Sequence, residues 1–172
     1  MNLPDQASIK KYSEVSVRLA DPSLLFELRK FFERKYALME LLDWLHQKIS
    51  WSDGDMVRHN DPLEIIAYGK GRCGELSILF TALCLAHDYR ARLILDMSDH
   101  VWTEVWDTKR KRWVHVDPSE KRIDDPLMYE RDWKKVLKEV YAFENGLIEN
   151  VTERYKTASP RDSQKETKRL SS

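Results

Sequence analysis

The feature that most constrains the fold is an uninterrupted apolar segment near the middle of the chain. Residues 73–87, CGELSILFTALCLAH, are apolar on nearly every side of a helix. A surface helix carries one apolar stripe, whereas a helix that is apolar all round must be covered on most sides. The sequence therefore predicts a central buried helix around which the rest of the chain packs. At 15 residues this segment falls short of the ~20 that a membrane span requires.

The segments before the central helix are predicted to be mainly helical. An Asp-Pro pair at 21–22, followed by leucines and phenylalanines at helical spacing, predicts a helix from about 22 to 50 with a break near 36. An Asn-Asp-Pro sequence at 60–62 begins a second, short helix that ends at Gly69 to Gly71.

The segments after the central helix alternate in the manner of strands. Runs at 91–97, 100–106 and 112–117 predict three strands, the last two joined by a polar loop at 107–110. Further along, the pattern predicts a helical stretch at 128–137 and two strands, at 140–144 and 147–151, with a turn at Asn145-Gly146 between them. Helices followed by an antiparallel sheet make the predicted class α+β.

Charge and cysteine content limit the partners of the chain. Lys and Arg number 29, as do Asp and Glu, so the net charge is zero and neither nucleic acid nor an anionic membrane is an expected partner. Protein partners stay unknown. The first 15 residues contain no apolar run of the kind found in a signal peptide, so a cytoplasmic location is expected. Beyond Tyr155 almost no apolar residue remains, which predicts a disordered tail over 156–172.

The two cysteines, Cys73 and Cys84, are eleven positions apart on one predicted helix. That separation is about 16 Å at 1.5 Å per residue, which is too long for a disulfide. The chain contains no Cys-x-x-Cys pair, so we expect no metal site and no cofactor. Cys84 is interpreted as a core residue, because free cysteine is among the most buried residue types.

The predicted hairpin gathers polar side chains on one face. Because alternate strand residues share a face, His100, Trp102 and Glu104 point the same way. His115 and Asp117 share a face of the next strand. A four-residue loop at 107–110 would pair residues whose numbers add up to 217, which places His100 directly opposite Asp117.

Cys73, His100 and Asp117 together fit the chemistry of thiol acyl transfer. A cysteine at the start of a helix has its thiolate favoured by the unpaired N–H groups there. A histidine can act as its base, and a carboxylate can orient that histidine. His115 is the second candidate for the base, but it lies on the same strand as Asp117.

Three tryptophans alternate with these polar residues. Trp102, Trp106 and Trp113 could be core residues. Their alternation with His, Glu and Asp favours the walls of a polar ligand cleft, on which sugar rings can stack.

Five motifs occur in order between Arg58 and Tyr155: RHNDP at 58–62, KGRCGE at 70–75, DHVWTEVW at 99–106, RWVHVDPSE at 112–120, and NVTERY at 150–155. Together they resemble the cytoplasmic peptide:N-glycanases, members of the transglutaminase-like superfamily with a papain-like core. The resemblance implies a transglutaminase-like catalytic domain over residues 1–155, in which residues 1–57 form a mainly helical part. The cysteine-bearing helix would pack on an antiparallel sheet.

The resemblance also implies a reaction and a substrate. A glycoprotein or peptide would lose its N-glycan by hydrolysis of the amide between an Asn side chain and the proximal N-acetylglucosamine. Cys73 would attack the amide carbon, His100 would transfer protons, and Asp117 would hold the imidazole. The residues that match the family's contacts to the chitobiose core of the glycan are Arg92, Trp102, Glu104 and Trp113.

One departure from the family and two other functions stay open. Eukaryotic members carry paired Cys-x-x-Cys zinc ligands before the RHNDP-like motif, whereas this chain has no cysteine before residue 58. The predicted helix at 22–50 would take the place of that lobe. The alternatives are a transglutaminase-like amidase, protease or acyltransferase acting on peptide or Gln amides, and a glycan- or protein-binding module with a vestigial triad.

Overall fold

The computed structural model describes residues 3–157 and confirms the α+β class. Six α-helices occur in this part of the chain: α1 (Leu3–Leu19), α2 (Pro22–Arg29), α3 (Leu38–Lys48), α4 (Pro62–Tyr68), α5 (Cys73–Ala86) and α6 (Met128–Arg131). A 3₁₀ turn, η1 (Thr152–Arg154), follows the last strand. Except for residues 156 and 157, the predicted disordered tail lies outside the described residues.

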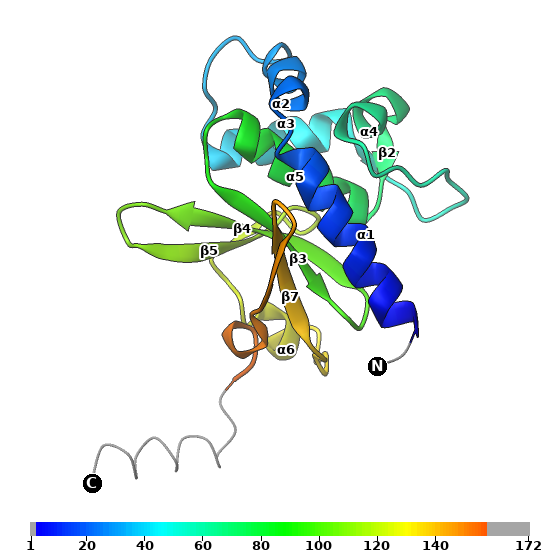
Figure 1. Ribbon diagram of the computed structural model, residues 1–172, viewed down its shortest axis with the longest axis vertical. Coiled ribbons are helices and arrows are strands. Elements are labelled where there is room, and N and C mark those ends of the chain that lie inside the picture. The colour runs from blue at the N-terminus through cyan, green and yellow to red at the C-terminus, as the bar shows by residue number, and fades with distance from the viewer. Residues whose placement is uncertain (1–2, 158–172) are drawn as a thin grey trace, which may run out of the picture.

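Six strands form one antiparallel sheet, and most helices lie to one side of it (Figure 1). The strand order is β6-β5-β4-β3-β7-β8. A separate pair, β1 (Ser50–Trp51) and β2 (Lys70–Gly71), is parallel. The sheet strands are β3 (Ala91–Asp96), β4 (His100–Asp107), β5 (Arg112–Asp117), β6 (Arg122–Ile123), β7 (Val140–Glu144) and β8 (Leu147–Asn150).

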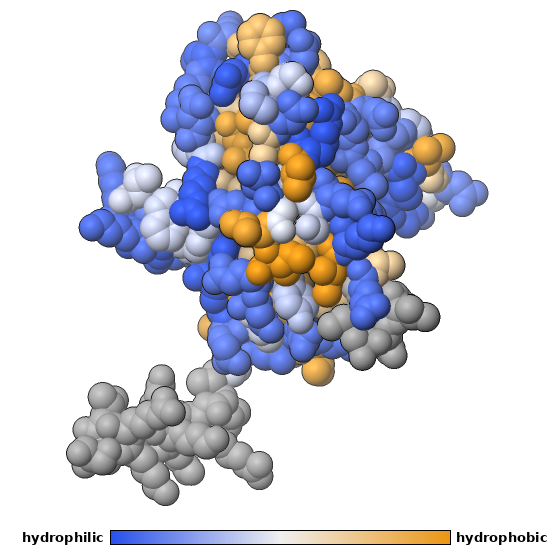
Figure 2. Space-filling model, viewed as in Figure 1, coloured by the Kyte–Doolittle hydropathy of each residue, from blue (hydrophilic) through white to orange (hydrophobic). Residues whose placement is uncertain are grey.

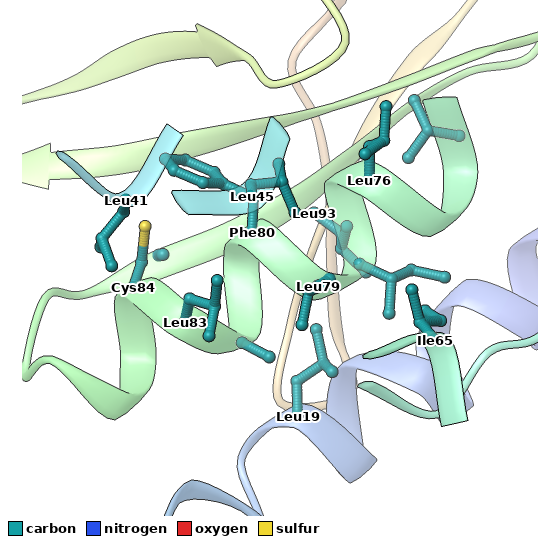
Figure 3. Packing of buried hydrophobic residues seen from close by; sticks show 14 of the residues in the cluster. Leu19, Leu41, Leu45, Ile65, Leu76, Leu79, Phe80, Leu83, Cys84 and Leu93 are labelled. Carbon is teal, nitrogen blue, oxygen red and sulfur yellow. The ribbon is translucent and has the colours of Figure 1, made fainter. Parts of the chain in front are cut away.

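Helix α5 is the buried centre of the molecule, as the sequence predicted. Nearly all of its residues are buried, and Figure 3 shows its side chains pointing in several directions toward other elements. They meet Leu41 and Leu45 of α3, Ile65 of α4, Leu19 of α1 and Leu93 of β3. Toward the sheet, the Ser77 hydroxyl donates to the carbonyl of Val101 over 2.9 Å. The helix is therefore fixed on both sides.

The N-terminal helices differ from the prediction in two ways. The predicted helix at 22–50 is two helices, α2 and α3, separated by residues 30–37, which is a wider break than expected. Residues 1–57 were expected to be mainly helical, but no separate helix was predicted for Leu3–Leu19, which is α1. Its buried residues Tyr12, Val15 and Leu19 form a narrow stripe between charged residues, so the helical period is weak in the sequence.

The β4–β5 hairpin has a different register from the predicted one. Trp106 pairs with Trp113 and Asp107 with Arg112, so paired numbers add up to 219 and the loop is 108–111. His100 is therefore not directly opposite Asp117. The shift is two residues, and an even shift leaves every side chain on its predicted face.

The C-terminal part confirms one prediction and shortens another. The β7–β8 hairpin turns at Asn145 and Gly146, which both have positive φ, as an Asn-Gly pair favours in a two-residue turn. The predicted helix at 128–137 is only the four-residue α6. The short strand β6 was not predicted.

The face of the molecule shown in Figure 2 is mainly polar and carries an apolar area near its middle. Figure 2 shows apolar atoms gathered near the middle of the face on which α1 and the β7–β8 hairpin lie. These elements carry the exposed apolar side chains Val17, Leu147 and Ile148. Among the described helices, none is both long and apolar enough to cross a membrane.

Replacing Leu79 by Ala should destabilise the fold strongly, because this fully buried side chain lies in the middle of α5. We expect the free energy of unfolding to fall by about 2 to 5 kcal/mol, as for other buried leucines. Urea unfolding followed by circular dichroism measures it. Leu147→Ala, on a side chain that is 73% exposed, is the control and should change it by less than about 0.5 kcal/mol. Equal effects of the two variants would contradict the assignment of α5 as the core.

Candidate active site

The start of α5 places Cys73 at the edge of the core. Cys73 is the first residue of the helix and is partly exposed, whereas Cys84 is buried. Gly71, two residues before Cys73, lets the chain pass close to the first turn of α5, since a Cβ at this position would lie 2.7 Å from the Cβ of Glu75. The first N–H groups of a helix have no partner within it and point toward its N-terminal end. Cys73 therefore lies at the end of α5 toward which the helix N–H groups point.

An ion pair between the buried Glu75 and the half-exposed Arg58 closes the first turn of α5. Glu75 is 1% exposed, and its carboxylate accepts hydrogen bonds from the Arg58 guanidinium and, over 3.0 Å, from the N–H of Arg72. The hydrogen bond with Arg58 offsets the cost of burial and holds the pKa of Glu75 below its ordinary value, although burial alone would raise it. The RHNDP segment is thereby attached beside Cys73.

His100 links Cys73 to Asp117. Its Nε2 lies 2.8 Å from Oδ2 of Asp117, which leaves Nδ1 to interact with Cys73. Burial alone would lower the pKa of His100, but the hydrogen bonds with Asp117 and Cys73 outweigh it and raise the pKa to about 9. The imidazole is thus held in its charged form beside the thiol at neutral pH.

Asp117 is fully buried but hydrogen-bonded at both carboxylate oxygens. Oδ2 accepts from His100 and from the hydroxyl of Tyr129, the latter over 2.7 Å. Oδ1 accepts from the N–H and hydroxyl of Ser119 over 3.0 and 2.8 Å, and from the N–H of Glu120 over 3.2 Å. Burial would raise the pKa of Asp117, yet these hydrogen bonds, above all that with His100, hold it below the ordinary value. Asp117 therefore stays ionised.

His115, the second candidate for the base, is hydrogen-bonded to Tyr129, which in turn donates to Asp117. Its Nδ1 accepts from the N–H of Asp125 over 3.2 Å, so Nε2 carries the proton and donates to the hydroxyl of Tyr129 over 2.8 Å. Burial lowers the pKa of His115 to about 4, which keeps the ring neutral. Both ring nitrogens are occupied inside the protein, so His115 can orient Tyr129 and has no free nitrogen for a substrate.

Arg92 and Glu104 are brought together, but in the interior. Arg92 Nε donates to Glu104 Oε1 over 2.9 Å, and both side chains are nearly or fully buried. The other oxygen of Glu104 accepts from Arg154 over 3.0 Å and from the Tyr155 hydroxyl over 2.6 Å. The polar groups of Arg92 and Glu104 are therefore hydrogen-bonded to other residues of the protein.

The three tryptophans occupy different environments. Trp102 is 0% exposed and stacks on Tyr129, with 4.4 Å between the ring centroids, in a second apolar cluster on the far side of the sheet from α5. The interpretation of all three indoles as cleft walls therefore does not describe Trp102. Trp106 and Trp113 are half-buried neighbours, and the Arg92 guanidinium lies 4.0 Å above the Trp113 ring.

The open space beside Cys73 is a cleft of about 260 Å³. It lies between α1, the start of α5 and the turn that leads into β4. Two residues of the site were not predicted from the sequence. Tyr12 lines the cleft from α1, for which no bounds were predicted, and the exposed Trp133 lies with its ring centroid 5.0 Å from that of His100. Residues that line the cleft include Ser8, Lys11, Tyr12, Arg58, Cys73 and Asp99.

Among the described residues there is no group of three or more His, Cys, Asp or Glu side chains that could hold a metal ion. Cys73 and its neighbours offer a thiol, a charged imidazole, a buried carboxylate and helix N–H groups. This set is suited to attack on a carbonyl carbon followed by proton transfer.

Comparison with known families decides the ancestry of the domain. Residues 29–118, more than half of the chain, match the transglutaminase-like superfamily, and residues 97–171 match the Rad4 transglutaminase-like domain. The chain belongs to the transglutaminase-like superfamily. The predicted fold class is confirmed, and so is the position of the cysteine-bearing helix against an antiparallel sheet.

The relatives found among curated proteins also confirm the resemblance to peptide:N-glycanases. Proteins named peptide-N(4)-(N-acetyl-beta-glucosaminyl)asparagine amidase are 48% identical in Drosophila melanogaster, 46% in Arabidopsis thaliana and 43% in Homo sapiens. Each match runs over 98 residues, which is 57% of this chain. The chain spans only 14% to 16% of the length of these relatives.

Solved structures of Rad4 share the fold. A structure described for its role in DNA duplex opening by the Rad4/XPC nucleotide excision repair complex gives a TM-score of 0.65 at 16% identity. The match covers 90% of this chain and 48% of that one. A Rad4–Rad23 complex crosslinked to undamaged DNA gives 0.63 at 14% identity. At these identities the likeness concerns the fold alone.

Iodoacetamide at neutral pH should label Cys73 much faster than Cys84 in the folded protein. The sulfur of Cys73 borders the cleft beside a charged imidazole, whereas complete burial raises the pKa of the Cys84 thiol. Peptide mapping by mass spectrometry at successive times measures both rates. In urea the two cysteines should react alike, and Cys73→Ser should leave the folded protein almost unlabelled. Equal labelling of both cysteines before unfolding would contradict the geometry of the site.

Replacing Asp117 by Asn should lower the pKa of His100 from about 9 toward or below its ordinary value of about 6.5. The reason is that the carboxylate hydrogen bond is lost while the burial that opposes the charged ring remains. NMR titration of the His100 ring protons measures the change. Asp55→Asn, in an exposed turn, is the matched control and should leave the pKa unchanged. An unchanged pKa in Asp117→Asn would mean that another group holds the charge on His100.

Proposed function

We propose that this chain is a thiol amidase of the peptide:N-glycanase type, which hydrolyses the amide between an Asn side chain and the proximal N-acetylglucosamine. The observation that carries the proposal is the arrangement of Cys73, His100 and Asp117: the His100 ring is hydrogen-bonded to Asp117 over 2.8 Å and is close enough to Cys73 for the two groups to interact. Support comes from relatives 41% to 48% identical over this region that are named as such amidases. Because the chain spans a small part of those relatives, the activity is inferred from the site.

The first half of the reaction breaks the amide. The Cys73 sulfur attacks the carbonyl carbon of the Asn side chain, and the carbonyl electron pair moves to the oxygen. When the carbonyl re-forms, the bond from carbon to nitrogen breaks, and His100 gives its proton to the departing nitrogen. The products of this half are a glycosylamine and a thioester on Cys73.

The second half restores the enzyme. Neutral His100 takes a proton from water as the water oxygen attacks the thioester carbon. The bond to sulfur then breaks, leaving an Asp side chain on the peptide and the Cys73 thiolate beside charged His100. Throughout, Asp117 keeps Nε2 of His100 protonated and oriented, while Tyr129 and Ser119 fix the carboxylate.

Glycan recognition by Arg92, Trp102, Glu104 and Trp113 stays part of the proposal, with unequal roles. Trp113 is partly exposed and can present indole edges to a sugar. Arg92 and Glu104 satisfy one another, and Trp102 is enclosed. We infer that these three hold Trp113 and the strands in place.

The hydrogen bonds that Arg92 and Glu104 already form favour one alternative, an amidase, protease or acyltransferase that acts on peptide or Gln amides. An enzyme with the same three residues would need no glycan contacts, and the polar groups of Arg92 and Glu104 already have protein partners. The vestigial binding module is less well supported, because the charged imidazole is retained next to the thiol.

Location and partners complete the proposal. A cytoplasmic location suits the chain, because a thiol nucleophile needs reducing conditions and both cysteines are free. We propose a glycoprotein or glycopeptide as the substrate. The DNA named with the Rad4 structures belongs to those proteins, and the zero net charge of this chain does not favour it.

Incubation with a denatured N-glycoprotein in H₂¹⁸O should release intact glycan and convert the glycosylated Asn to ¹⁸O-labelled Asp. Mass spectrometry of the peptide and of the glycan measures both products. Cys73→Ala should abolish them, because no other described nucleophile lies at the same position. The matched control is Cys84→Ala, which removes the buried thiol and should keep the activity.

Three outcomes separate the hypotheses. Glycan release that survives in Cys73→Ala would contradict the mechanism. Ammonia release from Gln peptides without glycan release would favour the transglutaminase-like alternative. Labelled Cys73 with no amide turnover on either substrate would favour the binding module.

A further inference from the structure

The hydroxyl of Tyr12 lies at the start of α5 without a partner. Tyr12, in α1, is 92% buried, and its ring packs near Phe143 of β7 with 6.1 Å between the centroids. The hydroxyl forms no hydrogen bond with any other residue that the structure describes. Although most of the residue is covered, its hydroxyl oxygen is not enclosed and borders the cleft, so it is available to a ligand.

This hydroxyl points at the first turn of α5. The oxygen is 3.6 Å from the position that a Cβ on Gly74, the residue after Cys73, would occupy. Tyr12 and Gly74 both line the cleft together with Cys73. Helix α1 crosses close to α5 in Figure 1, so this contact joins the N-terminal helix to the site. A group bound to the Cys73 sulfur would therefore lie next to the Tyr12 oxygen.

Arg58 is the other donor near this point, but it is already engaged. One of its terminal nitrogens is 3.4 Å from the same Gly74 position. Its guanidinium, however, holds both oxygens of the buried Glu75 carboxylate. Moving it toward a substrate would break these bonds and leave the buried carboxylate of Glu75 unpaired. Tyr12 can donate without losing any bond.

We propose that the Tyr12 hydroxyl is the second donor of the oxyanion site, acting together with the backbone N–H of Cys73. The inference rests on the proposed thiol chemistry at Cys73 but does not depend on the glycan. Tyr12 precedes residues 29–118, the region that matches the superfamily. The N-terminal helix thus supplies a catalytic group in this chain as well as packing.

The step that Tyr12 assists is the addition to the carbonyl. As the carbon–sulfur bond forms, the carbonyl electron pair moves to oxygen, and this oxygen accepts hydrogen bonds from Tyr12 and Cys73. The Tyr12 proton stays on its own oxygen. Burial and the nearby Cys73 raise the pKa of Tyr12 to about 12, so the hydroxyl remains a donor at neutral pH.

The test compares two reactions of Cys73 in wild type, Tyr12→Phe and a control. Iodoacetamide alkylates the sulfur without forming an oxyanion. A small peptide aldehyde adds the sulfur to its carbonyl carbon, and its oxygen then occupies the oxyanion position; its dissociation constant is measured by protection of Cys73 against alkylation. The control is Tyr36→Phe, near His87 at the other end of α5, about 20 Å along the helix from Cys73.

In Tyr12→Phe we expect the aldehyde to bind about tenfold or more weakly, while alkylation without aldehyde changes less than about twofold. Amide turnover should fall by about 10² to 10³, as when one oxyanion donor is removed elsewhere. Tyr36→Phe should match wild type in both reactions. If alkylation and aldehyde binding fall together, or if neither changes, Tyr12 only packs and the inference is overturned.

The same test separates this inference from the proposed substrate. Weaker aldehyde binding in Tyr12→Phe with no glycan release by wild type would support Tyr12 and reject the glycanase reaction. Glycan release by wild type, with turnover and aldehyde binding unchanged in Tyr12→Phe, would support the glycanase reaction and reject the role of Tyr12. An aldehyde that fails to protect wild-type Cys73 would overturn the inference, because the site would then hold no carbonyl adduct.

Discussion

The buried carboxylate of Asp117 is the interaction on which the arrangement of the site depends. An ionised group inside a protein is tolerated only when its oxygens are hydrogen-bonded. Here the donors come from β4 through His100, from the turn after β5 through Ser119, and from α6 through Tyr129. Satisfying one charge therefore fixes three separate segments. The same charge keeps His100 protonated, so the stability of the fold and the reactivity of Cys73 share one cause.

The fold could be predicted where the signal is local. An apolar run long enough for one helix predicted α5, and an Asn-Gly pair between two apolar runs predicted the β7–β8 hairpin. The bounds of helix α1 could not be predicted in the same way. Tyr12, Val15 and Leu19 are buried because the helix packs on β3, β7 and α5, whereas their own apolar pattern in the sequence is weak. Tertiary contacts decide the structure of such a segment.

The candidate site was predictable because an error of two in the strand register leaves each side chain on the same face of the sheet. The loop is one residue later than expected, which moves the pairing by two and keeps His100 and Asp117 on one face. A shift of one would have separated them. Tyr129 and Tyr12 could not be found by this reasoning, since each reaches the site from a helix whose place against the sheet is set only by packing.

The alternation of tryptophan with polar residues was ambiguous for a physical reason. A polar and aromatic strand face can line a ligand cleft or can be covered by a later segment that brings matching polar groups. At Glu104 the second case applies, because Arg154 and Tyr155, about 50 residues further on, satisfy its carboxylate and enclose Trp102. The cleft beside Cys73 lies on the other side of the sheet, where Leu95 and Val101 line it and α1 borders it. One face of the sheet therefore carries the polar groups that hold the strands, and the opposite face borders the cleft in which a carbonyl group can reach Cys73.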